Sequence, residues 1–317
     1  MKRYVLALTV VLAAAPVYAQ VAPAADPHAG HATSEPSNAQ QAPAAPAAAA
    51  TNGPRNANLP PPGDPNPVAT EQLATALKSS PRKSEWVDIK GSNGTPIKSF
   101  VVYPDRRDKA PVVIVVMEIF GLSDWIRGVT DQLAKEGFIA IAPDFLSGMG
   151  PNKGGSAELG SQGSTQAIGA VTLDDRMRIM NDVRAYASTI PSANGKLGAV
   201  GFCWGGGTVF AYALTQPALN GAVSYYGPMP ADATAYANAK VPVLGLYGGN
   251  DARVNANIEL AKTEMAKAKA SYDPHIFDGA GHGFLRQQAG NANAPGNLKA
   301  TEQAWPLTIE FLKNHTK

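Results

Sequence analysis

The residues best placed for chemistry centre on Cys203, the one cysteine of the chain. It lies in the stretch GFCWGGG (201–207), between an expected strand and an expected helix. This is the G-x-nucleophile-x-G turn with cysteine in place of serine. Gly201 and Gly205 leave room for a sharp turn, and the following helix points its N-terminal amides at the reacting atoms. Elsewhere a lone cysteine is more often an inert core residue, but this setting predicts a nucleophile.

A thiol nucleophile needs a base and a group that orients the base, and in such folds both follow the nucleophile along the chain. Asp251 comes directly after the expected strand 241–247, and His282 follows the last expected strand. Taken alone, Asp251 could be a helix cap and His282 a surface histidine. No other histidine of the sequence follows a strand in this way. We therefore predict His282 as the base and Asp251 as its orienting acid.

Glu118 is a charged residue at the end of a buried strand, directly after the six apolar residues 112–117. It could be no more than a partly solvated loop carboxylate. If it lies beside the Cys203 sulfur, its negative charge disfavours the thiolate at rest, and it could accept the thiol proton when substrate arrives.

Four segments together resemble the dienelactone hydrolase family of α/β-hydrolases: MEIFG (117–121), GFCWGG (201–206), GGND (248–251) and GHGF (281–284). The resemblance covers roughly residue 83 to the C-terminus. It implies hydrolysis without a cofactor, with Cys203 as nucleophile, His282 as base and Asp251 as its orienting group. It also implies that Glu118 pairs with the thiol in the resting enzyme.

The resemblance also bears on substrate binding. Family members of the degradative type hold the substrate carboxylate with two arginines, one of which matches Arg286. The second has no evident match, because the stretch 156–170 within the expected loop 147–170 is small and uncharged apart from Glu158. This departure argues against a strict dienelactone substrate.

The expected reaction is cleavage of a small-molecule ester or lactone. The Cys203 thiolate adds to the carbonyl, the backbone amides of Trp204 and of the loop near Phe120 hold the oxyanion, and water attacks the thioester with His282 as base. Two alternatives on the same fold stay open: a non-catalytic periplasmic binding protein and a thiol redox sensor. A sensor would lack a second cysteine to resolve a sulfenic acid.

The elements that must position these residues alternate between strands and helices. The run VVIVVM (112–117) is typical of a strand buried on both faces of a parallel sheet. Strands are expected at 85–90, 97–103, 112–117, 138–142, 197–201, 221–226, 241–247 and 271–277, and helices near 126–133, 173–183 and 305–312. The alternation predicts a mostly parallel sheet with helices on both faces, which the resemblance makes an α/β-hydrolase fold. Ligands bind such sheets at the carboxyl ends of the strands. Pro306 predicts that the last helix begins near it or bends there.

The N-terminal part predicts export. Residues 1–19 read as a signal peptide, with a basic start, a short apolar run and small residues before a cut after Ala19. Residues 20–66 form an Ala/Pro-rich segment that we expect to be a disordered tether, and the catalytic domain spans 67–317. His28 and His31 in the tether are too few ligands for a defined metal site. The predicted location is the periplasm or the exterior.

Composition narrows the classes of partner. With 44% apolar and 16% charged residues the chain suits a globular protein with one core. A net charge of +2, from 27 basic and 25 acidic residues, gives no electrostatic footprint for nucleic acid. After signal cleavage we expect no membrane insertion, since no later stretch approaches about 20 apolar residues. We expect no cofactor, no metal and a monomer.

Overall fold

The computed structural model describes residues 77–317. The predicted signal peptide, the tether and the first ten residues of the expected catalytic domain, 67–76, therefore lie outside the described residues. The described part is built on an eight-stranded sheet in the order β1-β2-β4-β3-β5-β6-β7-β8. The strands are β1 Ser84–Ile89, β2 Ile97–Val102, β3 Ala110–Val116, β4 Ile139–Pro143, β5 Ala193–Phe202, β6 Gly221–Tyr225, β7 Val243–Gly248 and β8 Tyr272–Phe277.

The sheet is mostly parallel, as predicted. Strand β1 pairs antiparallel with β2, and β2 pairs antiparallel with β4, whereas every other neighbouring pair is parallel. The central strand β3, with sequence APVVIVV, is buried along almost its whole length, as a strand covered on both faces must be. The edge strand β1 alternates between exposed and half-buried side chains.

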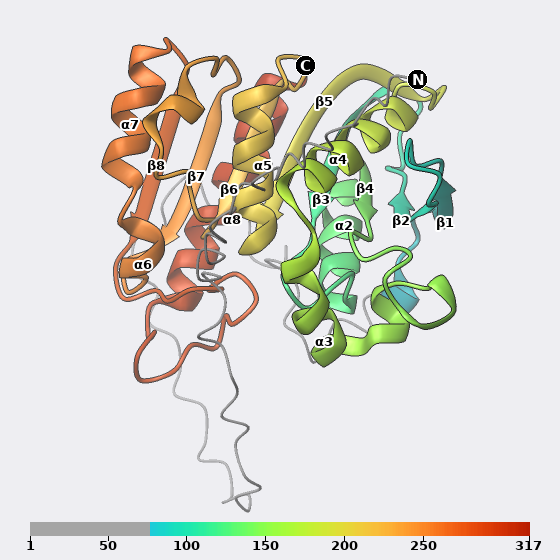
Figure 1. The fold of residues 1–317 in the computed structure, drawn as a ribbon, viewed down its shortest axis with the longest axis horizontal. Coiled ribbons are helices and arrows are strands. Elements are labelled where there is room, and N and C mark those ends of the chain that lie inside the picture. The colour runs from blue at the N-terminus through green and yellow to red at the C-terminus, as the bar shows by residue number, and fades with distance from the viewer. Residues whose placement is uncertain (1–76) are drawn as a thin grey trace, which may run out of the picture. The chain divides into compact units, whose positions relative to one another are not determined.

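Helices cover both faces of the sheet. Figure 1 shows α4 and α5 over one face and α2 and α8 over the opposite face. The helices are α2 Asp124–Lys135, α3 Ser156–Ala167, α4 Leu173–Ala187, α5 Trp204–Thr215, α6 Ala252–Asn255, α7 Ile258–Lys267 and α8 Asn297–His315, with short 3₁₀ turns η1 Pro151–Lys153, η2 Ile168–Ala170 and η3 Ala233–Tyr236. Helix α8 begins well before Pro306 and includes it. Within residues 77–317, none of the helices combines the length and the apolar composition of a membrane span.

The segment 147–170 differs from the prediction. It was expected to be a loop, but it forms η1, α3 and η2. The sequence of α3, SAELGSQGSTQA, has few apolar residues and contains Gly160 at φ 63°, so neither periodicity nor helix propensity marks it. The start of α3 is fixed instead by hydrogen bonds from Ser156 to the carboxylate of Asp144, which follows β4. Contacts with another part of the fold decide this local structure.

Candidate active site

The predicted turn around Cys203 is confirmed. Strand β5 ends at Phe202, helix α5 begins at Trp204, and Cys203 between them adopts φ 55° and ψ −118°. A positive φ is uncommon for a residue with a side chain. The turn tolerates no side chain at its two glycines: a Cβ on Gly201 would lie 2.1 Å from the Gly205 carbonyl oxygen, and one on Gly205 would lie 2.4 Å from that of Met117. The thiol is thus held above the carboxyl end of β5 and is almost buried.

The structure brings His282 and Asp251 together. The imidazole Nδ1 donates to Asp251 Oδ2 across 2.5 Å. The other carboxylate oxygen, Oδ1, accepts a hydrogen bond from the amide of Val254 and caps α6, so Asp251 has both roles that its position allowed. Burial alone would lower the pKa of His282, but hydrogen bonding with Asp251 and with Cys203 raises this pKa to about 9. The acid, the imidazole and the thiol therefore interact in series.

Glu118 lies at the same edge, with Arg286 as its observed partner. Its Oε2 accepts a hydrogen bond from Arg286 Nε at 2.8 Å, and its side chain is 3% exposed. Burial raises the pKa of Glu118, while the nearby charges of Arg286 and His282 act in the opposite direction. The Arg286 guanidinium also stacks on the ring of Phe120, 4.7 Å from its centroid. The structure thus places Glu118, Phe120 and Arg286 in one cluster, with Glu118 paired to a cation rather than to the thiol expected from the resemblance.

The turn that carries Glu118 is held by a chain of hydrogen bonds that the sequence did not suggest. The amide of Leu122 donates to Ser156 Oγ at 3.0 Å. The Ser156 hydroxyl in turn donates to Asp144 Oδ1 at 2.6 Å, and the Ser156 amide donates to Asp144 Oδ2 at 2.7 Å. Gly121 has φ +81° and faces Ser156 so closely that a Cβ there would lie 2.5 Å from the hydroxyl. The signal in the sequence was the place of Asp144, a carboxylate directly after a buried strand, like Glu118.

Tyr226 is a second residue that the sequence analysis missed. It follows β6 directly, is fully buried, and has φ 39°. Its ring meets the His282 imidazole with centroids 5.1 Å apart. The sequence places Tyr226 directly after a strand, which is β6, the neighbour of β5. A tyrosine at the end of a buried strand is, however, interpreted first as a core residue.

Trp204, whose amide we expected to face the oxyanion, is the first residue of α5, so its N–H has no partner within the helix. Its indole packs edge-on against Phe145 at 5.4 Å, and the guanidinium of Arg176 lies 5.2 Å from its ring centroid. Arg176 belongs to α4, beyond the stretch 156–170 that lacks an arginine. A guanidinium is therefore present next to the Cys203 turn, but it belongs to α4 and not to the segment in which the second arginine was expected.

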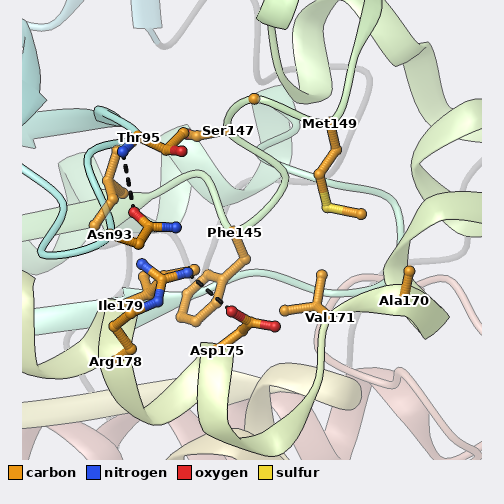
Figure 2. Close-up of a pocket in the computed structure, with 12 residues that line it drawn as sticks. Asn93, Thr95, Phe145, Ser147, Met149, Ala170, Val171, Asp175, Arg178 and Ile179 are labelled. Carbon is orange, nitrogen blue, oxygen red and sulfur yellow. Dashed lines mark hydrogen bonds and ion pairs between the residues drawn. The ribbon is translucent and has the colours of Figure 1, made fainter.

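Phe145, which follows the carboxyl end of β4, also lines a pocket of about 290 Å³. Figure 2 shows Phe145, Met149 and Val171 around it, with the Asp175–Arg178 ion pair, 3.0 Å long, on the α4 side. Because Phe145 contacts Trp204, this pocket adjoins the turn that carries Cys203.

Metal-ligating side chains do not gather at this edge. Within residues 77–317, no three His, Cys, Asp or Glu side chains are grouped so that they could hold a metal ion. The groups that do meet are a thiol at a helix N-terminus, an imidazole and a carboxylate, a combination suited to nucleophilic acyl transfer.

Comparison with known proteins identifies the family of the chain. The model of the dienelactone hydrolase family matches residues 97–316. A protein of Salmonella typhimurium strain LT2, provisionally named a carboxymethylenebutenolidase, is 33% identical over 243 residues, which cover 71% of this chain and 85% of that protein. Among solved structures, a provisionally named dienelactone hydrolase from Klebsiella pneumoniae superposes with a TM-score of 0.64 at 24% identity, covering 73% of this chain and 98% of the other. A dienelactone hydrolase-like promiscuous phosphotriesterase from metagenomic libraries has the same TM-score at 22% identity, with coverage of 74% and 99%.

These two structures share the fold, and the family model covers most of the described residues. The chain therefore belongs to the dienelactone hydrolase family and is a hydrolase with an α/β-hydrolase fold.

Proposed function

We propose that this protein cleaves carboxylic ester or lactone bonds of small molecules with Cys203 as nucleophile, His282 as base and Asp251 as the acid that orients it. The observation that carries the proposal is geometric: His282 is hydrogen-bonded to Asp251 across 2.5 Å, and Cys203 stands in the strained turn between β5 and α5. Burial would lower the pKa of His282, yet hydrogen bonding with Asp251 and Cys203 raises it to about 9. An imidazole with this pKa holds a proton at neutral pH, which it can give to the leaving oxygen of the substrate.

In the proposed reaction, the Cys203 thiol gives its proton to the Glu118 carboxylate, its sulfur attacks the carbonyl carbon, and the electron pair of the carbonyl moves onto its oxygen. The amides of Trp204 and of the turn near Phe120 bind that oxyanion. When the adduct collapses, the leaving oxygen takes a proton from His282, and an acyl thioester remains. Water then attacks the thioester and one of its protons passes to His282. The sulfur leaves and takes its proton back from Glu118, which restores the thiol and releases the acid product.

Glu118 and Arg286 form the second part of the proposed site. Arg286 provides a cation that could hold an anionic group of the substrate, as the family resemblance implies, in competition with the Glu118 carboxylate. A carboxylate freed in this way is poised to accept a proton near the sulfur, because burial already raises the pKa of Glu118. The exported location inferred from residues 1–19 stays a prediction.

The test is turnover of p-nitrophenyl acetate and of a simple lactone by wild type, Cys203→Ala and His282→Ala. We expect each variant to lose at least about a thousandfold in kcat, as triad knockouts do. His275→Ala is the matched control, because His275 also pairs with an aspartate, Asp273 at 3.1 Å, but lies on the sheet-edge strand β8. An ester-like probe should label wild type at Cys203.

Cys203→Ala retaining more than about a tenth of wild-type kcat would rule out the mechanism, since nothing else here offers a comparable nucleophile. A wild type that folds but cleaves no ester or lactone would return attention to a binding or redox role, which the comparisons do not support.

A further inference from the structure

The hydroxyl group of Tyr226 is buried and unused. Among residues 77–317 its oxygen has no hydrogen-bond partner, and the residue has no exposed surface. The neighbouring Tyr225 is equally buried, but its hydroxyl lies 2.5 Å from Thr308 Oγ1 and 3.2 Å from the Ala304 carbonyl oxygen. A buried hydroxyl without a partner has lost its hydrogen bonds to water and gained none in the protein, which destabilises the folded state. Phenylalanine would fill the same space without an unpaired hydroxyl. Packing alone therefore does not explain a tyrosine at this position.

The backbone of Tyr226 is also unusual. Its φ of 39° lies in the left-handed region, which is strained for a residue with a side chain. Two hydrogen bonds hold the strand end in place: the Tyr226 amide donates to the Leu246 carbonyl at 2.8 Å, and the Cys203 amide donates to the Tyr225 carbonyl at 3.0 Å. Cys203 and Tyr226, which both have positive φ, thus belong to one hydrogen-bonded unit at the carboxyl ends of β5 and β6.

The side chain of Tyr226 lies among the proposed catalytic groups. Its ring contacts the His282 imidazole at 5.1 Å and packs on Phe284 at 5.4 Å. Burial raises the pKa of Tyr226 well above its ordinary value, Glu118 and Cys203 raise it further, and Arg286 partly opposes them. The phenol therefore keeps its proton at every pH at which the enzyme would work, and it can offer a hydrogen bond to a negatively charged atom.

From the contact with His282, the backbone unit shared with Cys203 and the unpartnered buried hydroxyl, we propose that Tyr226 is a catalytic residue. Its hydroxyl donates a hydrogen bond to the substrate oxygen that becomes negatively charged when Cys203 adds to the carbonyl. This inference rests on the proposed function. The carbon–sulfur bond forms, the carbonyl electron pair moves to oxygen, and Tyr226 shares its proton without losing it. On collapse the pair returns, and the leaving oxygen departs with the proton of His282.

Such a donor acts on the charged adduct much more than on the neutral carbonyl, so it should affect kcat rather than KM. The test is Tyr226→Phe, which removes one oxygen atom. We expect kcat for p-nitrophenyl acetate to fall about a hundredfold, as for loss of one oxyanion donor, with little change in KM. The control is Tyr225→Phe, which removes a hydroxyl that is bonded to α8, and its kcat should stay near the wild-type value.

A second readout is the affinity of a trifluoromethyl ketone, which adds to a cysteine thiolate and forms a charged tetrahedral adduct. Tyr226→Phe should weaken this inhibitor by a factor similar to its loss in kcat, and its melting temperature should be at least that of wild type. A kcat and inhibitor affinity close to wild type, or a lower melting temperature, would overturn the role of Tyr226. Cys203→Ala measured in parallel separates the two proposals: if that variant is inactive while Tyr226→Phe is fully active, only the tyrosine assignment fails.

Discussion

Replacing Arg286 by methionine removes the cation beside a buried carboxylate, together with its contact on the Phe120 ring, and keeps the apolar stem of the side chain. In the native protein the Arg286–Glu118 hydrogen bond is 2.8 Å long, and the exposed fractions of the two side chains are 27% and 3%. Breaking a buried pair by removing one partner typically costs about 3–5 kcal/mol. Because Arg286 is partly exposed to solvent, we expect the lower end of this range, about 3 kcal/mol. For domains of this size that corresponds to a fall in melting temperature of about 6–12 °C.

The loss should depend on pH, because Glu118 can escape its unpaired charge by taking up a proton. Burial already raises its pKa, and loss of Arg286 removes an interaction that lowers it. Below the ordinary glutamate pKa of 4.5 the side chain is neutral in the folded and unfolded states, so the deficit is smallest there. As the pH rises from that value through the higher pKa of the folded state, the unfolded chain ionises first and stability falls. Adding Glu118→Gln to Arg286→Met should recover most of the stability and remove this pH dependence.

The assay is thermal unfolding of wild type, Arg286→Met and the double variant across this pH range. Lys262→Met is the control, because Lys262 forms an exposed ion pair with Glu259 at 3.0 Å. Such a pair is worth about 0–1 kcal/mol. An Arg286→Met melting temperature within about 2 °C of wild type at neutral pH, or no recovery in the double variant, would refute the reasoning.

Two further predictions follow from the same site. Burial lowers the pKa of His282, but hydrogen bonding with Asp251 and Cys203 raises it from 6.5 to about 9, so the free energy of unfolding should decrease as the pH rises through this interval. Chemical unfolding at several pH values measures this decrease, and in Asp251→Asn it should be smaller. A wild-type free energy of unfolding that does not change over this interval would contradict the prediction. Ser156→Ala removes the group that joins Leu122 to Asp144, and we expect about 1–3 kcal/mol less stability in urea unfolding. In steady-state kinetics its kcat should fall about tenfold with KM unchanged. Ser164→Ala is the matched control, because the Ser164 hydroxyl also faces Gly121. It should change neither stability nor kcat, because this hydroxyl has no hydrogen-bond partner among residues 77–317.

The fold was predictable wherever burial on both faces of the sheet leaves a continuous apolar run. The run 112–117 marks β3, and the glycine-rich stretch 201–207 marks the boundary between β5 and α5. Helix α3 was not predictable, because small polar residues carry no periodic signal. The helix starts where Ser156 donates hydrogen bonds to Asp144. The local sequence around either residue does not reveal that the two will be in contact.

The site was predictable only in part. The chain order of Cys203, Asp251 and His282 and their places after strands suffice to nominate them, because parallel strands end at one edge. The partner of Glu118 was harder, since it depends on which side chains from distant turns reach a buried carboxylate. Tyr226 was missed because its distinguishing features, a positive φ and an unpartnered hydroxyl, exist only in three dimensions.

The hydrogen bonds that run from Asp144 through Ser156 to Leu122 have a consequence for how the protein can diversify. Surface segments beside a catalytic centre usually accept insertions and exchanges freely, which is how relatives acquire new substrates. Here the first residue of α3 is hydrogen-bonded to the turn that carries Glu118, so a rearranged segment 147–167 would also shift the proposed site. Libraries aimed at new specificity should therefore vary the far end of α3 and leave its first turn intact.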